Sequence, residues 1–174
     1  MMDLRYPIGP FKLEEEITEQ TRRRFIDQIA ETPANLRAAV EGLSQEQLDT
    51  PYRPEGWTVR QVIHHVADSH MNSYIRVKLA LTEDRPNVTD YDENQWGSLS
   101  DAQKAPIDLS LNLIESLHGR WIFLFNSLNP NDFSKTFNHP ARGAVSLDTN
   151  IAIYAWHGRH HVAHITTLRE RMHW

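Results

Sequence analysis

Residues 58–81 read TVRQVIHHVADSHMNSYIRVKLAL, and this stretch decides the predicted fold. Thr58 and Gln61 have the spacing of a capping box, in which each side chain accepts a hydrogen bond from the backbone N–H of the other residue. The pair predicts a helix that begins at Thr58 and runs to about Leu81. The histidines on this predicted helix are His64, His65 and His70.

The segment before this helix is predicted to hold an N-terminal arm and two more helices. Residues 1–12 contain prolines and a glycine, and they are expected to form an extended arm. Apolar residues at helical spacing predict a helix from Glu14 to about Glu31. Thr32 and Pro33 follow in the order of a helix cap and a first helical residue, so a second helix is expected to restart there.

The segment after residues 58–81 is predicted to contain two further long helices. The expected order is irregular chain over residues 83–106, a helix over 107–128, a short hairpin or loop over 137–145 and a final helix ending near Arg171. Either Asp148 or Thr149 is expected to cap this last helix. Substantial helices with long connections are typical of an all-α bundle, which is the predicted fold class.

Composition restricts the class of protein. The chain has 174 residues and 40% hydrophobic content, enough for a single domain over residues 1–174 with its own core. The net charge is -5 and both signs are interspersed, so no nucleic-acid partner is expected. The absence of cysteine removes disulfides, iron–sulfur clusters, cysteine zinc sites and a cysteine nucleophile. Neither a signal peptide nor a bilayer-length apolar run is found, so a cytoplasmic protein without a membrane partner is expected.

Residues 156–164 read WHGRHHVAH and place four histidines on the predicted last helix. Because residues four apart share a helical face, His157 and His161 can direct ring nitrogens to one point, as can His160 and His164. Imidazole binds zinc, nickel, copper and iron. Imidazoles beside an apolar stripe lose free energy unless each finds a partner, and one metal ion can serve several. The pattern predicts a metal site, with exposed or separately hydrogen-bonded rings as the alternative.

Two helical histidines do not complete a metal site, so a third ligand is expected from the helix over residues 58–81. His64 and His65 are adjacent and face about 100° apart around that helix, so both cannot easily reach one ion. Neither helical stripe decides between them, and His70 is the next histidine along the chain. The residue pattern therefore leaves the third ligand open.

Residues 56–68, GWTVRQVIHHVAD, resemble the signature of the DinB superfamily, in which a Trp followed by Ser or Thr opens a helix. In that signature a ligand histidine comes eight residues after the Trp, a position held here by His65. The second motif of the superfamily, two histidines four apart on the last helix, matches His157 and His161. The resemblance implies a four-helix bundle that holds one divalent metal ion by these three histidines.

Other segments resemble the YfiT branch of this superfamily in particular. They are residues 4–9, 91–94, 139–140 and 154–158. The resemblance implies a metal-dependent hydrolase acting on a small molecule, with one zinc or nickel ion per chain, in a homodimer. Other members imply an alternative, detoxifying thiol S-transfer from bacillithiol or a similar low-molecular-weight thiol. His160 and His164 lie outside the implied ligand set, and many relatives carry glutamine at the position of His164.

Both activities use the same three ligands. An ion held by three histidines keeps positions open, where it lowers the pKa of bound water to about 7 or deprotonates a bound thiol. Since the chain has no cysteine, a thiolate has to come from a cosubstrate. A third alternative is a metal-binding or ligand-binding module without turnover, which predicts that protein groups seal the open positions.

The pattern does not determine catalytic residues beyond the metal ligands. A hydrolase normally needs a base near the water that it activates, and the candidates are Asp68, Asp92, Glu93 and His160. A thiol transferase mainly needs a pocket. Its candidate lining residues are Asn94, Gln95, Trp96, Arg142 and Arg159.

Overall fold

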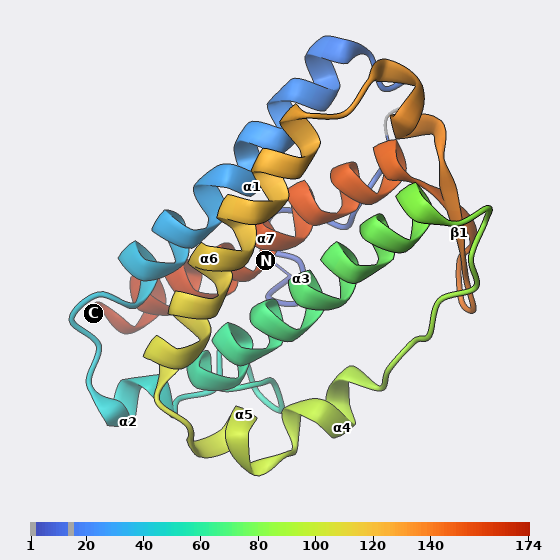
Figure 1. The fold of residues 1–174 in the computed structure, drawn as a ribbon. Helices are drawn as coiled ribbons and strands as arrows, with labels where there is room; N and C mark the ends of the chain where they lie inside the picture. The colour runs from blue at the N-terminus through green and yellow to red at the C-terminus, as the bar shows by residue number, and fades with distance from the viewer. Residues whose placement is uncertain (1–2, 14–15) are drawn as a thin grey trace.

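The computed structural model describes residues 3–13 and 16–174, and four long helices lie together in it as a bundle (Figure 1). These helices are α1 (Glu19–Val40), α3 (Val59–Thr82), α6 (Ile107–Asn126) and α7 (Leu147–Met172). Helices α1 and α3 each contact both α6 and α7, so the contacts close a ring around one core. The predicted all-α four-helix bundle is therefore confirmed. Within the described ranges, no helix is both long and apolar enough to cross a membrane.

The long connection between α3 and α6 follows from the direction of these helices. Both run the same way in Figure 1, so residues 83–106 have to return along the bundle before α6 can begin. The sequence predicted irregular chain over this return segment. The structure differs, because the segment contains the two short helices α4 (Glu93–Gly97) and α5 (Ser100–Lys104). The remaining short elements are α2 (Gln45–Leu48) and the 3-10 helix η1 (Pro130–Ser134).

A two-stranded antiparallel hairpin precedes α7. Its strands are β1 (Thr136–His139) and β2 (Gly143–Ser146), with Phe137 paired to Val145. Both of these apolar side chains are buried in the bundle core. Of the two predicted alternatives for this segment, a hairpin or a loop, the structure has the hairpin. The predicted cap of the last helix is wrong, because Ser146 accepts the N–H of Thr149 at 3.1 Å.

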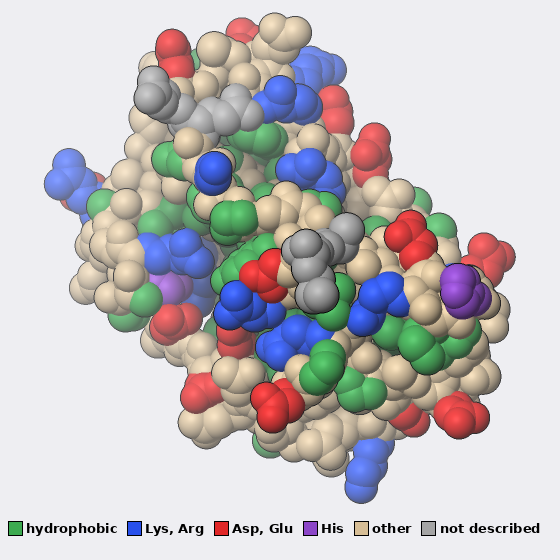
Figure 2. Space-filling view, turned by 180° about the vertical axis from the view of Figure 1, so that it is seen from behind, with side chains coloured by type: hydrophobic (Ala, Val, Ile, Leu, Met, Phe, Trp, Pro, Cys, Tyr) green, Lys and Arg blue, Asp and Glu red, His purple; other side chains and the backbone are tan. Residues whose placement is uncertain are grey.

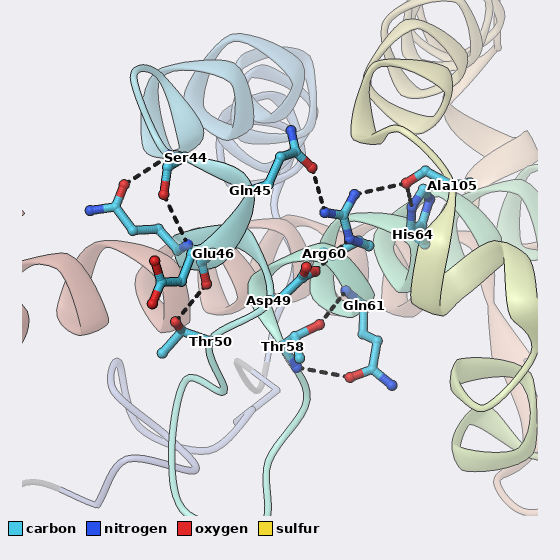
Figure 3. A network of polar contacts seen from close by, with 11 residues as sticks. Ser44, Gln45, Glu46, Asp49, Thr50, Thr58, Arg60, Gln61, His64 and Ala105 are labelled. Atoms are coloured by element: carbon cyan, nitrogen blue, oxygen red, sulfur yellow. Dashed lines mark hydrogen bonds and ion pairs between the residues drawn. The ribbon is translucent and has the colours of Figure 1, made fainter.

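The predicted capping box opens α3 (Figure 3). The Thr58 N–H donates to Gln61 Oε1 at 2.9 Å, and the Gln61 N–H donates to Thr58 Oγ1 at 3.2 Å. Beside this box the buried Arg60 donates to Asp49 Oδ1 at 2.7 Å and to the Ala105 carbonyl at 3.0 Å. One side chain of α3 therefore ties the chain after α2 to the chain before α6, which fixes the start of α3 at this end of the bundle.

Helix α1 corrects the predicted break at Thr32 and Pro33. The structure has one helix from Glu19 to Val40 with Pro33 in its interior, and the predicted start at Glu14 lies outside the described residues. An interior proline leaves the carbonyl four residues earlier without its helical N–H donor. That carbonyl belongs to Ile29, and the side chain of His118 lies 2.7 Å from it through Nδ1. A partner on α6 thus replaces the missing donor, which the local sequence could not reveal.

A layer of polar side chains divides the bundle core into two apolar clusters. The cluster at the hairpin end includes Ile29, Val77, Trp121, Phe137 and Ile151. The cluster at the α2 end includes Leu36, Val62, Ile63, Ile114 and Ile165. Between them along the four helices lie the buried residues Thr32, His70 and His118 and the start of the histidine run of α7. The candidate site is therefore built into the middle of the core.

Gly158 allows α7 to approach α1 closely at this layer. A Cβ placed on Gly158 would lie 2.5 Å from Thr32 Oγ1 and 2.8 Å from Thr32 Cγ2. Contacts this short force the two helices or the buried threonine to move. A helical glycine is therefore required here by space and not by backbone conformation.

Gly158→Ala is expected to destabilise the protein by roughly 1–2 kcal/mol, because overpacking costs about 1–3 kcal/mol and exceeds the gain in helix propensity. Adding Thr32→Ala should recover stability, since it removes both clashing atoms. Gly119→Ala is the matched control, because a Cβ there meets no described atom within 4 Å. Urea unfolding of these variants checks the result. Equal effects of the two glycine substitutions would contradict it.

Candidate metal centre

Three histidines from two helices converge at the polar layer. His65 comes from α3 and His157 and His161 from α7, and one ring nitrogen of each lies within 4.8 Å of the others. His157 Nε2 is 3.3 Å from His65 Nε2 and 3.2 Å from His161 Nε2. Tetrahedral ligands at the usual zinc–nitrogen distance of about 2.0–2.1 Å are separated from one another by about 3.3–3.4 Å. The two measured separations therefore fit two edges of such a site.

Burial keeps these three rings in the form that binds metal. Burial, followed by the neighbouring His164, lowers the pKa of His65 to about 4. Burial is also the main cause of the pKa values of His157 and His161 falling well below 6.5, with other histidines adding to the effect. All three imidazoles are consequently neutral at pH 7. A neutral imidazole offers a lone pair, which is what a metal ion requires.

His64 is directed away from this cluster, which resolves the choice that the helical stripes left open. Its Nε2 donates to the Ala105 carbonyl at 3.1 Å (Figure 3). Its Nδ1 lies 2.7 Å from Ser110 Oγ, on α6. His64 thus contributes to the junction with α6, and the structure brings His65 to the cluster.

His160 and His164 surround the cluster without joining it. The His164 ring stacks on Tyr52 at a centroid distance of 4.0 Å, and its Nδ1 is 3.3 Å from His161 Nδ1. The His160 ring stacks on Trp156 at 4.3 Å, and its Nδ1 is buried without a hydrogen-bond partner among the described residues. Both therefore pack around the His161 side of the site.

The N-terminal arm covers this part of α7. Over residues 3–13 the arm has no helix or strand, but it forms turns instead of the predicted extended chain, while Met1 and Met2 lie outside the described residues. The Gly9 carbonyl accepts a hydrogen bond from Trp156 Nε1 at 3.1 Å, and the Arg5 carbonyl lies 3.1 Å from His164 Nε2. The arm therefore supplies backbone acceptors next to the site.

His70 and His118 extend the cluster into the core, and sequence reasoning missed His118. His70 Nε2 is 3.0 Å from His157 Nδ1, and His70 Nδ1 is 2.8 Å from His118 Nε2. The sequence pattern offers His70 only as a further candidate ligand, whereas in the structure its ring contacts the Nδ1 side of His157. The available signal for His118 was its position on the apolar stripe of α6, between Ile114 and Trp121.

Two cavities of about 460 Å³ each border the cluster. One includes all three converging histidines in its lining together with Arg53 and Trp57. The other extends toward the hairpin and includes Tyr91 and His139. Both cavities share the lining residues His157, Glu93, Asn94 and Arg142. Each volume is in the range of small-molecule pockets, which run from about 300 to 1,000 Å³.

Glu93 is the candidate base that the structure places beside both cavities. Burial, with added repulsion from Asp90 and Asp92, raises the pKa of its carboxyl above the ordinary value. Asp92 is different, because its carboxylate caps α4 by accepting the N–H groups of Asn94 and Gln95 at 3.0 Å. Those backbone hydrogen bonds lower the pKa of Asp92. Glu93 therefore combines access to the site with a carboxyl that holds a proton more readily.

The other two candidate bases are less suited to this task. Burial, assisted by Asp101, raises the pKa of Asp68 to about 6, but Asp68 is not among the described residues that line either cavity. Burial, assisted by His164, lowers the pKa of His160 to about 3, which makes its ring a weak base. Among the candidate residues for a thiol pocket, Arg159 donates to the Ala155 carbonyl at 3.1 Å, while Asn94 and Arg142 line both cavities.

The fold and the site together place this protein among helical bundles that carry a cluster of histidines beside a cavity. A family model described as the DinB superfamily matches residues 28–165. The chain belongs to the DinB superfamily, which confirms the family that the motifs predicted.

Similarity to individual proteins extends over the whole chain. Proteins named "Putative metal-dependent hydrolase" from Bacillus mycoides (strain KBAB4) and Bacillus cereus (strain 03BB102) are each 56% identical over 174 residues, covering 100% of both chains. A solved structure of YfiT from Bacillus subtilis is 48% identical, has a TM-score of 0.95 and covers 98% of each chain. It is described as "a probable metal-dependent hydrolase with an unusual four-helix bundle topology". The chain is accordingly a YfiT-type member of the superfamily.

Proposed function

We propose that this protein is a metal-dependent hydrolase of a small molecule, with one divalent ion, zinc or nickel, held by His65, His157 and His161. The observation that carries the proposal is the meeting of these three neutral imidazoles beside a cavity of about 460 Å³. The Nε2 atoms of these rings approach one another to 3.2–3.3 Å, and two nitrogens that both present lone pairs at such a distance repel unless a cation lies between them. The donor set therefore fits a divalent ion, and three ligands leave coordination positions open.

When bound, a divalent ion in such a site would lower the pKa of water to about 7 and so supply a nucleophile at neutral pH. The remaining functions fall to side chains of this chain. Glu93, with its raised pKa, accepts the proton that the attacking water loses and can return it to the leaving group. Arg142 lines the same cavities and its charge is favourable for an anionic part of the substrate.

Thiol S-transfer is the second candidate because two cavities meet at His157. One cavity can take a thiol cosubstrate and the other an electrophile, and the chain itself has no cysteine to act as nucleophile. A module without turnover is less well supported, since all three converging histidines line a cavity and are not sealed from it by other side chains. The proposal also includes a cytoplasmic homodimer, for which the exposed Leu109 and Leu113 of α6 offer an apolar surface.

Substituting the cluster histidines tests the metal site. His65→Ala, His157→Ala and His161→Ala should each lower the affinity for zinc and nickel more than ~100-fold, beyond the loss typical of a supporting hydrogen bond. His64→Gln is the matched control, because that side chain is buried next to His65 but bonds to Ala105 and Ser110. Elemental analysis and metal titration measure the result. Stoichiometric metal in all three alanine variants would show that the ligand assignment is wrong.

Two assays distinguish the candidate reactions. Metal-dependent hydrolysis of p-nitrophenyl acetate without added thiol supports the hydrolase. Consumption of 1-chloro-2,4-dinitrobenzene that requires bacillithiol or cysteine, and that is lost in His157→Ala, supports S-transfer instead. On the face seen in Figure 2, Lys and Arg side chains lie among Asp and Glu side chains.

A further inference from the structure

His157, His70 and His118 form a hydrogen-bonded relay that ends at a backbone carbonyl. That carbonyl determines which ring nitrogen of each histidine carries the proton. The Ile29 carbonyl can only accept, so His118 Nδ1, 2.7 Å away, must carry a proton and donate it. A neutral imidazole has one N–H, so His118 Nε2 accepts from His70 Nδ1 at 2.8 Å. His70 Nε2 then accepts from His157 Nδ1 at 3.0 Å. The one remaining lone pair of His157, on Nε2, faces the metal centre.

A second, shorter chain gives the same result for His161. The Arg5 carbonyl accepts from His164 Nε2 at 3.1 Å, so the His164 proton is on Nε2. His164 Nδ1 consequently accepts from His161 Nδ1 at 3.3 Å. His161 is therefore protonated on Nδ1, and its Nε2 lone pair also faces the centre, 3.2 Å from that of His157.

We propose that His70, His118 and His164 are positioning residues that hold His157 and His161 in the Nδ1–H tautomer, with both Nε2 lone pairs committed to the metal site. A free histidine side chain favours the opposite tautomer, with the proton on Nε2. In that form the proton would occupy the space of the ion. The two carbonyls reverse this preference before any metal arrives, because each relay has one direction in which all its nitrogens are satisfied.

Pro33 contributes to the relay of His118, His70 and His157. The Ile29 carbonyl is the acceptor that an N–H at position 33 would otherwise use in the helix, and proline has none. The carbonyl is thus left for His118, which belongs to a different helix. The rings of His70 and His118 are buried, so an additional proton, and with it a charge, on this relay would be costly. The interior proline of α1 therefore connects to the site through three imidazoles.

The purpose assigned to these relays rests on the proposed metal site, but the tautomers themselves are measurable without metal. In metal-free protein labelled with ¹⁵N-histidine, long-range ¹H–¹⁵N correlation spectra should show His157, His161, His70 and His118 as Nδ1–H and His164 as Nε2–H. Finding His157 or His161 in the Nε2–H form in the folded wild type would overturn the proposal. Correct tautomers combined with no zinc or nickel binding would instead remove the proposed function alone.

Substitution of His118 tests the causal direction. In His118→Phe the His70 N–H loses its acceptor, so His70 can turn its proton toward His157 and displace the His157 proton onto Nε2. The expected result is that tautomer change together with a 10–100-fold loss of zinc affinity. His118→Gln carries a donor and an acceptor side by side and should restore both readouts. An unchanged His157 tautomer and zinc affinity in folded His118→Phe would contradict the proposal.

Two further variants complete the experiment. Trp121→Phe is the packing control, because the indole contacts His70 and His118 with centroid distances of 6.0 and 5.8 Å but its N–H has no partner among the described residues. This substitution should leave the histidine tautomers and the zinc affinity unchanged from the wild type. His164→Phe should change the tautomer of His161 while leaving that of His157, and a loss of both together would show that the relays are not independent.

Discussion

Acidifying the metal-free protein from pH 6.5 to pH 4.5 is expected to lower its free energy of unfolding, and His65 and His118 alone should account for roughly 4 kcal/mol of the loss. Burial lowers the pKa of His65 and of His118 from 6.5 to about 4. On unfolding each ring returns to a pKa near 6.5, so between these values the unfolded chain binds more protons. This stabilisation is complete above about pH 6.5 and is lost as the pH falls toward 4. Each such histidine contributes about 1.4 kcal/mol per pH unit within that window.

Urea unfolding at a series of pH values measures this dependence. Metal-free protein is needed because bound metal adds its own pH dependence through the ligands. In His118→Gln one titrating group is absent, so the slope below pH 6.5 should decrease by about one proton. A flat profile between pH 7 and 4.5 would mean that the buried rings are solvated or already protonated in the folded protein.

Replacing Glu93 with glutamine is expected to lower hydrolytic kcat by about 10²–10⁴-fold, the usual contribution of a general base. The amide lines the same cavities but cannot accept a proton from the attacking water. Metal content should stay unchanged, because Glu93 is not one of the converging ligands. Steady-state hydrolysis and elemental analysis of the same sample separate the two effects.

Asp92→Asn is the matched control for Glu93→Gln. Asparagine can still cap α4 by accepting the two N–H groups that Asp92 now binds, so kcat should change less than about tenfold. If Glu93→Gln hydrolyses substrate as fast as the wild type, another group takes the proton. A thiol S-transferase should be much less sensitive to Glu93→Gln, since a divalent ion held by the three histidines would itself favour loss of the thiol proton.

Local chemistry accounts for the parts of the fold that were predicted correctly. The capping box involves two residues only three positions apart, Thr58 and Gln61, so the start of α3 could be predicted from the local sequence. The prediction at Pro33 was wrong for the opposite reason. A proline inside a helix leaves the carbonyl four residues earlier without a donor, so proline normally favours a helix start. Here His118, far along the chain on α6, supplies the donor for that carbonyl.

The candidate site likewise has parts that the sequence predicted and parts that it could not predict. Helical spacing alone indicated that His157 and His161 point together, and the family motif added His65, which the structure places with them. Spacing could not exclude His64, because the acceptor that turns it away is the Ala105 carbonyl at the end of α5. Nor could it show that the arm reaches His164 through the Arg5 carbonyl.

The sequence by itself determined the long helices α3, α6 and α7 and the pair of histidines on α7, because each depends on residues within a few turns. The tertiary structure decided what turns His64 away from that pair, which candidate base borders both cavities and where the ring protons lie. These properties depend on backbone carbonyls and side chains from separate segments, brought together by burial of the apolar clusters on both sides of the histidine layer. No local pattern encodes such contacts, since each partner is chosen by packing.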